Sequence, residues 1–161
     1  MSASPAIVRL RDVAAGDVDQ FFEHQSDPVA HRMAAFGTKN PGDRDAFMTK
    51  WGRIMADAAI VKRTILLDDH VAGHVASFER LGQREVTYWL GREFWGRGVA
   101  TRALSLFLNE ETTRPLYARV VRDNGGSLRV LEKCGFAVVA YERAFAEARG
   151  EEVEEAILVL R

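Results

Sequence analysis

The sequence contains a single cysteine, Cys134, among its 161 residues. One cysteine excludes an internal disulfide and cannot supply the sulfur ligands of a structural zinc site. A chain without disulfides suits a reducing compartment, so we expect a cytoplasmic protein. Cys134 follows a short helical pattern and has no evident activating partner, which favours packing over a role as a nucleophile.

Long apolar runs and a surplus of charge of one sign are also absent. The formal net charge of -1 gives no electrostatic reason to expect nucleic acid as a partner. No apolar run approaches the ~18 residues that span a bilayer, and the N-terminal residues lack a signal-peptide pattern. We therefore expect neither nucleic acid nor a membrane among the partners, and the protein to act as a monomer or homodimer.

Internal repeats, low-complexity tracts and linkers are missing as well. A composition of 47% hydrophobic and 28% charged residues is that of an ordinary globular protein, and the length predicts one domain over residues 1–161. No metal site is expected. His70 and His74 share one face of a predicted strand, but they stand about 13 Å apart, too far to ligate one ion.

The hydrophobic pattern predicts alternating strands and helices. Helices are expected over 14–27, 43–55, 99–109 and 127–134; the first must stop near Asp27, because Pro28 disfavours helical dihedrals in the residue before it. The stretch 31–40 is ambiguous, and AEARGEE, residues 146–152, is expected to be an exposed connection. Strands are expected over 6–11, 60–67, 70–80, 83–90, 116–123, 136–143 and 155–160. This order predicts an α/β (α+β) fold with a mixed sheet.

The segment 88–109, YWLGREFWGRGVATRALSLFLN, joins a strand to an amphipathic helix through a turn containing Gly96 and Gly98. Without a Cβ, these glycines permit unusual dihedrals and let a ligand approach the backbone N–H groups. A helix start also carries unpaired donors and about half a positive charge, so it favours anions. The helix has one apolar stripe: Val99, Ala100, Ala103, Leu104, Phe107 and Leu108. The segment therefore predicts a site for a phosphate-bearing cofactor.

A second block, DNGGSLRVLEKCGF at 123–136, follows at a defined distance. Together with Trp95-Gly96-Arg97-Gly98-Val99-Ala100 it resembles the GNAT superfamily of N-acetyltransferases, in particular the ribosomal-protein N-terminal acetyltransferases. The resemblance covers the second half of the chain. Trp95 departs from the Gln or Arg usual at the first signature position. The resemblance implies a sheet of about seven mostly antiparallel strands with a V-shaped splay, flanked by about four helices.

The resemblance also implies acetyl-CoA as co-substrate. Backbone N–H groups from Arg97 to Thr101 would bind the pyrophosphate at the helix start, and the backbone of the strand near Tyr88 would bind the pantetheine. Asn124 matches the position whose amide contacts the pantetheine, and Ser127 the position near the thioester sulfur. The implied cofactor-binding residues are Tyr88, Trp89, Leu90, Arg97, Gly98, Val99, Ala100, Thr101, Asn124 and Ser127.

The implied chemistry is direct attack of a neutral amine on the thioester carbonyl. A backbone N–H near Leu90 would bind the oxyanion. The family's usual acid, a tyrosine, aligns with Leu131, so Ser127 is the best substitute, with Asn124 beside it. A thiol with a pKa of about 8.5 also leaves tolerably without full protonation. Glu79 is nominated as base, His74 is second, and a water chain is a third possibility.

Several alternatives stay open at this point. Asn124 is equally well explained as a helix cap, and core packing explains Trp51, Trp89 and Phe47 as well as a substrate pocket does. Loss of the tyrosine leaves a non-catalytic acyl-CoA-binding module as the alternative function. A nucleotide-binding enzyme fits poorly, because no Gly-Lys-Ser/Thr follows the turn. The acceptor is a primary amine, either a protein N-terminus or a small molecule. A site without a strong base leans toward an α-amine, which loses its proton for about 3 kcal/mol less than lysine.

Overall fold

The computed structural model describes residues 6–35 and 40–161 of the chain. One seven-stranded sheet runs through it in the order β1-β2-β3-β4-β5-β7-β6. Every neighbouring pair is antiparallel except β4 and β5, which are parallel. The strands are β1 (Val8–Arg11), β2 (Val61–Leu67), β3 (His70–Arg80), β4 (Gln83–Leu90), β5 (Leu116–Val121), β6 (Ala137–Ala146) and β7 (Glu151–Leu160).

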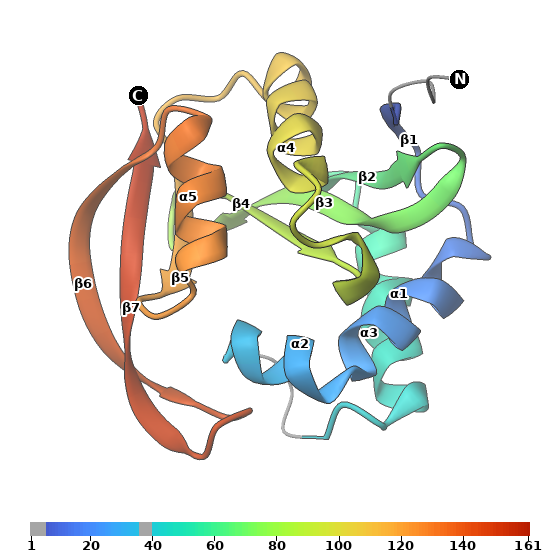
Figure 1. The fold of residues 1–161 in the computed structure, drawn as a ribbon, viewed down its shortest axis with the longest axis horizontal. Helices are drawn as coiled ribbons and strands as arrows, with labels where there is room; N and C mark the ends of the chain where they lie inside the picture. Colours follow the sequence, from blue (N-terminus) through green and yellow to red (C-terminus); the bar gives the residue numbers. More distant parts are fainter. Residues whose placement is uncertain (1–5, 36–39) are drawn as a thin grey trace, which may run out of the picture.

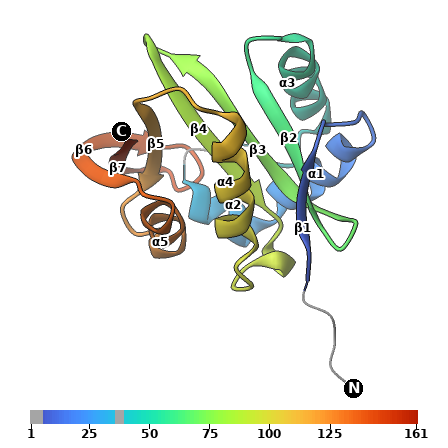
Figure 2. The same cartoon turned by 90° about the horizontal axis from the view of Figure 1, so that it is seen from above.

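Helices cover both faces of the sheet (Figures 1 and 2). Two of them, α4 and α5, lie on one face, and the other three lie on the opposite face. The described residues form five α-helices and the short 3-10 helix η1 (Arg92–Phe94). The α-helices are α1 (Asp17–Ser26), α2 (Pro28–Ala34), α3 (Arg44–Ala56), α4 (Val99–Glu110) and α5 (Gly125–Lys133).

Helix α2 is one more than the sequence predicts, and it lies partly in the ambiguous stretch 31–40. As expected, α1 ends at Ser26, and Asp27 is extended before Pro28. Pro28 then occupies the first position of α2, where its missing N–H is no loss, and the Asp27 carboxylate accepts from Val29 N–H. The proline that ends one helix therefore begins the next. Residues 36–39 of the ambiguous stretch lie outside the described residues.

The final hairpin is longer than predicted. Strands β6 and β7 remain paired as far as Ala146 opposite Glu151, so the connection is only 147–150 rather than the whole of 146–152. It is only partly exposed, because the Arg149 side chain is 7% exposed and pairs with Asp123. The glutamates of this stretch are exposed, which is why the sequence reads as a loop. Main-chain pairing between neighbouring strands keeps it extended all the same.

The main core lies between the sheet and helices α4 and α5. The apolar stripe predicted for α4 faces this core, with Val99, Ala103, Leu104 and Phe107 each at most 1% exposed. A smaller cluster between α1, α3 and the sheet contains Phe21 and Trp51, whose ring centroids are 4.9 Å apart. No helix in 6–35 or 40–161 has both the length and the hydrophobicity to cross a membrane.

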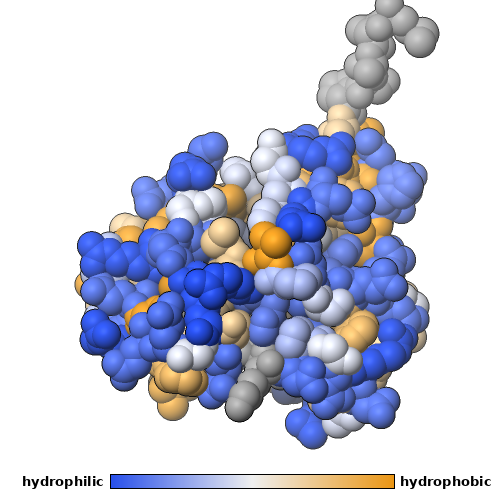
Figure 3. Space-filling view, turned by 60° about the horizontal axis from the view of Figure 1, so that its bottom comes forward, coloured by the Kyte–Doolittle hydropathy of each residue, from blue (hydrophilic) through white to orange (hydrophobic). Residues whose placement is uncertain are grey.

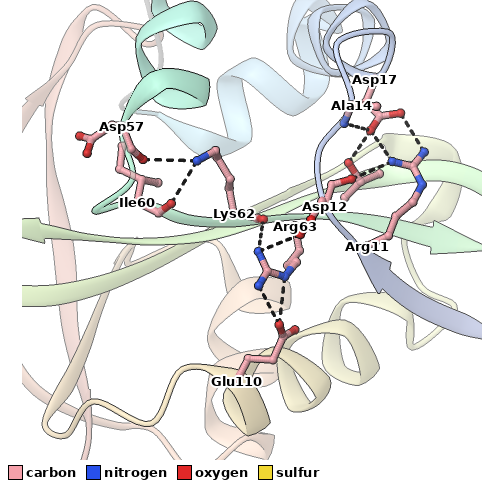
Figure 4. A network of polar contacts seen from close by, with 10 residues as sticks. Arg11, Asp12, Ala14, Asp17, Asp57, Ile60, Lys62, Arg63 and Glu110 are labelled. Carbon is pink, nitrogen blue, oxygen red and sulfur yellow. Dashed lines mark hydrogen bonds and ion pairs between the residues drawn. The ribbon is translucent and has the colours of Figure 1, made fainter.

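A buried carboxylate ties α1 to the first two strands of the sheet (Figure 4). Asp17 accepts from both nitrogens of Arg11, at 2.6 and 2.9 Å, and from the Thr64 hydroxyl at 2.7 Å and the Ala14 N–H at 2.8 Å. Burial by itself would raise the pKa of Asp17, but these hydrogen bonds, led by that of Arg11, lower it from 3.8 to about 2. The ionised carboxylate therefore stabilises the fold.

Replacing this aspartate, Asp17→Asn, is expected to remove about 2 kcal/mol of unfolding free energy at pH 7. Because the pKa is lower in the folded state, the stabilisation is present above 3.8 and is lost as pH falls through about 2. Urea unfolding at pH 7, 4 and 2.5 measures the unfolding free energy of both proteins, and the difference between variant and wild type should shrink on acidification. Asp12, whose side chain is 93% exposed beside Arg63, is the control, since Asp12→Asn should change stability by less than about 1 kcal/mol. A gap independent of pH would contradict the assignment.

Candidate functional site

The sheet opens between its two parallel strands. Strands β4 and β5 pair at one position only, Glu85 opposite Tyr117, and diverge beyond it. By contrast, β3 and β4 pair over eight successive positions, from Gly73–Leu90 to Arg80–Gln83. The V-shaped splay implied by the sequence is therefore present, and the residues after Glu85 on β4 no longer pair with β5.

A large cavity of about 1470 Å³ lies at this opening. It is lined by the start of α4 and by α5 from one side, and by α2, α3 and β3 from the other. Single-ligand pockets are usually about 300–1,000 Å³, so this volume has room for two substrates meeting in the gap. The face seen in Figure 3 is mostly hydrophilic, with a small group of hydrophobic residues near its centre.

The first turn of α4 borders the cavity through Gly98, Val99, Ala100 and Thr101. Gly98 is left-handed, with φ of 73°, and among the described residues no side chain caps this helix. The first-turn N–H groups therefore lack side-chain acceptors, which is the arrangement that binds an anion. The turn is held from behind by Arg102, whose guanidinium donates to the carbonyls of Ala6, Arg97 and Gly98. The side chain of Arg97 itself is exposed.

Trp95, the departure from the usual signature, fastens the turn to β4. Its indole N–H donates to the Leu90 carbonyl at 2.9 Å. The next residue, Gly91, donates its N–H to the Ala72 carbonyl of β3 at 2.9 Å. The end of β4 is therefore fixed on both sides. Trp89 lines the cavity, and its indole nitrogen is buried with no hydrogen-bond partner in the described structure.

Two hydroxyl groups meet across the splay. Tyr88 Oη of β4 and Ser127 Oγ of α5 are 2.8 Å apart, and both residues line the cavity. Burial raises the pKa of the Tyr88 phenol above 10, with the Ser127 hydrogen bond opposing the shift. The sequence nominated Ser127, but for Tyr88 only a backbone role. The signal for its side chain was the alternation of residues along β4, which places Tyr88 on the same strand face as the buried Val86 and Leu90. That face packs against α4 and α5.

Asn124 is the N-cap of α5. Its Oδ1 accepts from Ser127 N–H at 3.2 Å, so the capping role is present. The amide nitrogen takes no part in that bond, and Asn124 also lines the cavity. The structure thus brings Asn124, Ser127 and Tyr88 together. Leu131, at the position of the family's tyrosine, is 2% exposed in the main core.

Glu79, nominated as base, is not joined to this group by any contact in the described structure. Its side chain is 60% exposed and lies 3.8 Å from Arg84, which in turn pairs with Glu111 at 2.7 Å. Opposed residues of neighbouring strands share a face, so Glu79, opposite Arg84, faces away from Glu85. Glu79 lines the rim of the large cavity as a solvated strand-end carboxylate.

His74, the second nominee, is packed between aromatic rings. Its ring centroid is 4.8 Å from those of Phe21 and Trp51, and Nδ1 is buried without a partner in the part of the chain described. Burial, with the nearby positive charge of Lys50, lowers the pKa of His74 to about 3. A group that holds a proton only in strong acid is a poor base at neutral pH.

Sequence reasoning missed a cluster of charges on the other side of the splay. Arg119 of β5 lies 3.2 Å from Glu155, 3.3 Å from Glu85 and 3.0 Å from Glu142. Glu155 and Glu85 are 13% exposed and line the cavity, whereas Glu142 is 56% exposed. Burial raises the pKa of Glu155, against the hydrogen bond from Arg119. A glutamate with a raised pKa in a cavity is a candidate base, and only the fold shows that it faces Arg119.

Metal ligands do not gather in the described residues, where no group of three or more His, Cys, Asp or Glu could hold an ion. The site offers backbone donors, hydroxyls, an amide and carboxylates. Such groups suit binding of an anionic ligand and proton transfer in a cavity with room for two reactants.

Comparison with known proteins agrees with this arrangement. The family described as Acetyltransferase (GNAT) domain matches residues 8–137. Among solved structures, a GNAT-family acetyltransferase from Bacillus anthracis is similar, with a TM-score of 0.77, 17% identity, and coverage of 95% of this chain and 93% of that one. Mycobacterium smegmatis RimJ, in complex with CoA-disulfide, has a TM-score of 0.75 and 18% identity, covering 95% and 81%.

A third similar structure is the spermidine N-acetyltransferase of Vibrio cholerae in complex with CoA and spermine. Its TM-score is 0.75 at 16% identity, with coverage of 94% of this chain and 95% of that one. No curated protein sequence gives a significant match. At these identities the solved structures establish the fold.

Proposed function

This chain belongs to the GNAT acetyltransferase family, and from that membership we propose that it moves an acetyl group from acetyl-CoA to a primary amine. The observation that carries the proposal is the opening between β4 and β5 beyond Glu85–Tyr117, with the uncapped start of α4 at its edge. An elongated thioester fits a gap between strands because it can bond to backbone groups that have lost their strand partner.

The donor side of the proposed site follows from the turn at Gly98. The pyrophosphate of acetyl-CoA binds the N–H groups from Arg97 to Thr101, and the pantetheine runs beside Tyr88, Trp89 and Leu90 toward Asn124 and Ser127. Complexes of the similar RimJ with CoA-disulfide and of the spermidine acetyltransferase with CoA support this donor. When bound, acetyl-CoA supplies the activated acetyl group.

The acceptor side is the part of the cavity lined by Glu85, Glu155 and Arg119. Three glutamates lie beside Arg119, and Arg80 lies 3.5 Å from one of them, Glu85. Three carboxylates against two guanidinium groups still leave the cluster with a net negative charge, which attracts an ammonium group. Glu155 then takes the proton that the amine must lose, directly or through water, before the nitrogen attacks the thioester carbonyl. This replaces our first nomination of Glu79, which faces the other side of the sheet.

The acceptor class is a protein N-terminal α-amine or a small-molecule amine. The resemblance to ribosomal-protein N-terminal acetyltransferases favours the former, and similarity to a spermidine acetyltransferase favours the latter. A single carboxylate as base suits the α-amine better, since its pKa of about 7.7–8.0 requires a smaller shift than the ~10.4 of a lysine-type amine.

An acceptor screen tests the proposal. Purified protein is incubated with acetyl-CoA and a panel of peptides with free N-termini, polyamines and amino acids, while thiol release is followed and products are weighed by mass spectrometry. The expected result is acetylation of at least one class of amine, with thiol and product in equal amounts. Tight acetyl-CoA binding in calorimetry without thiol release from any amine would instead favour a non-catalytic acyl-CoA-binding module. Absence of acetyl-CoA binding would overturn both.

A further inference from the structure

Tyr88 and Ser127 are 39 positions apart in sequence, yet their hydroxyl oxygens are 2.8 Å apart. Tyr88 belongs to β4, which borders the splay, and Ser127 belongs to α5, which lines the cavity at that opening. A hydroxyl–hydroxyl bond that joins such elements places both groups in the gap that the thioester is proposed to enter. Both side chains line the cavity, so the pair borders the space for a ligand.

The direction of this hydrogen bond follows from the acidity of the two groups. A phenol is a better donor than an aliphatic alcohol, and the high pKa of the buried Tyr88 keeps it protonated at neutral pH. Ser127 is held at its backbone by Asn124, whose Oδ1 accepts from the Ser127 N–H. With Tyr88 donating to Ser127 Oγ, the Ser127 O–H is left to donate onward, and donation in series strengthens each bond.

A hydroxyl that can donate a proton is needed where the thiolate leaves the thioester. Leu131, at the position where the family resemblance implies a tyrosine, has a side chain with no proton to donate and is buried in the core. Cys134, the only thiol, donates toward the Thr101 carbonyl at 3.6 Å. Tyr88 therefore supplies, from a strand, the phenol hydroxyl that α5 lacks at Leu131.

We propose that Tyr88 is a positioning residue that directs the Ser127 hydroxyl at the thioester sulfur and replenishes its proton. This rests on the function proposed above. As the amine nitrogen bonds to the carbonyl carbon, the C–S bond breaks and its electron pair stays on sulfur. The Ser127 proton moves to sulfur, the Tyr88 proton moves to Ser127, and Tyr88 regains the proton that the amine loses through the carboxylate cluster and water. The products are the amide and the CoA thiol, with no net change of charge.

The first test uses CoA alone and needs no acceptor. A hydroxyl donor aimed at sulfur stabilises the thiolate, so the thiol of bound CoA should ionise at lower pH than free CoA. Ultraviolet absorbance of the thiolate measures this, with desulfo-CoA bound to the same variant as the reference that cancels tyrosine absorbance. In Tyr88→Phe the midpoint of thiol ionisation should rise by about one pH unit. Tyr141→Phe is the control, because Tyr141 is exposed on β6 and stacks with Arg122 outside the cavity.

A double-mutant cycle tests whether Tyr88 acts through Ser127. Ser127→Ala should raise the midpoint as Tyr88→Phe does, and adding Tyr88→Phe to Ser127→Ala should then raise it no further. Additive shifts would overturn the positioning role, and so would equal midpoints in wild type and Tyr88→Phe. Thermal unfolding and CoA affinity, measured for each variant, separate this loss from misfolding.

The second test uses an acceptor from the screen, or hydroxylamine if none is found. Tyr88→Phe is expected to lower kcat about 100-fold with little change in KM for acetyl-CoA. With the selenium analogue of acetyl-CoA the deficit should shrink, because a selenolate leaves without needing a proton. An equal deficit with both donors would contradict the proposal. Failure of wild type to bind CoA would overturn the proposed function and this inference together. CoA binding in which the thiol ionises at the same pH as in free CoA would overturn only the inference.

Discussion

Replacing Gly98 with valine is expected to weaken acetyl-CoA binding at least about 100-fold, roughly 2.8 kcal/mol. Gly98 has φ of 73°, a conformation that costs an L-residue about 1–2 kcal/mol, and a β-branched residue resists it most. A Cβ at this position meets no protein atom within 4 Å, so it points into open space beside the first-turn N–H groups. That is where the phosphates are proposed to lie. The side chain would therefore both distort the turn and occupy the anion site.

Gly82 is the matched control for this substitution. It lies beside Leu81 in the β3–β4 turn, with φ of 79° and nothing within 4 Å of an added Cβ. Gly82→Val imposes the same backbone strain outside the cavity and should lower thermal stability without changing acetyl-CoA affinity. Calorimetric titration with acetyl-CoA and thermal unfolding separate the two effects. An affinity within a factor of three of wild type in a folded Gly98→Val protein would remove the pyrophosphate site from this turn.

Glu155→Gln is expected to lower kcat about 100-fold at neutral pH, since general-base catalysis contributes about 10²- to 10⁴-fold. Glutamine keeps the size and the hydrogen-bond acceptor toward Arg119 but cannot take a proton. Initial rates with the best amine from the screen measure the loss. The substitution should leave acetyl-CoA affinity unchanged, because the cluster lies on the acceptor side.

The pH dependence of kcat should show the protonation of Glu155. Because burial raises the pKa of Glu155 above its usual 4.5, the carboxylate becomes protonated at a higher pH than an ordinary glutamate. Wild-type kcat should therefore start to fall while the pH is still above 4.5, and this acidic limb should be missing in Glu155→Gln.

Glu142 provides the control for the charge itself. It binds the same arginine nitrogen, at 3.0 Å, but is 56% exposed, and it is not among the cavity-lining residues. Glu142→Gln should leave kcat within about twofold of wild type. A comparable loss in both variants would mean that the cluster acts through its charge on Arg119, and an unchanged rate in Glu155→Gln would return the role of base to water.

Much of the fold was predictable because its signals are local. The α4 stripe, the helix end before Pro28 and the cap of α5 by Asn124 depend on residues within a few positions of one another. The resemblance to GNAT enzymes, read from 95–100 and 123–136, is confirmed by the family match, and the fold class with seven strands is confirmed by the structure. Helix α2 was missed because its cap and proline also read as the end of α1.

The catalytic nominations were less predictable, because they depend on contacts between distant segments. Glu79 ends a strand beside the expected cleft and shares a face with Arg84, but only β5 and β7, far along the chain, place the buried Arg119–Glu155 pair beside Glu85 on the opposite face. His74 reads as a titratable side chain, yet packing between Phe21 and Trp51 makes its ring neutral. Neither the aromatic packing around His74 nor the place of the charge cluster can be inferred from neighbouring residues.

Most of the elements, the glycine turn at the start of α4 and the family can be inferred from the residues, because each depends on residue types at short, fixed spacings. Which side chains meet is known only from the folded chain. Tyr88 reaches Ser127 across the splay, and Glu155 reaches Arg119 from a strand 36 positions further along the chain. Such pairs depend on strand order and register, and their burial raises the pKa of both Tyr88 and Glu155.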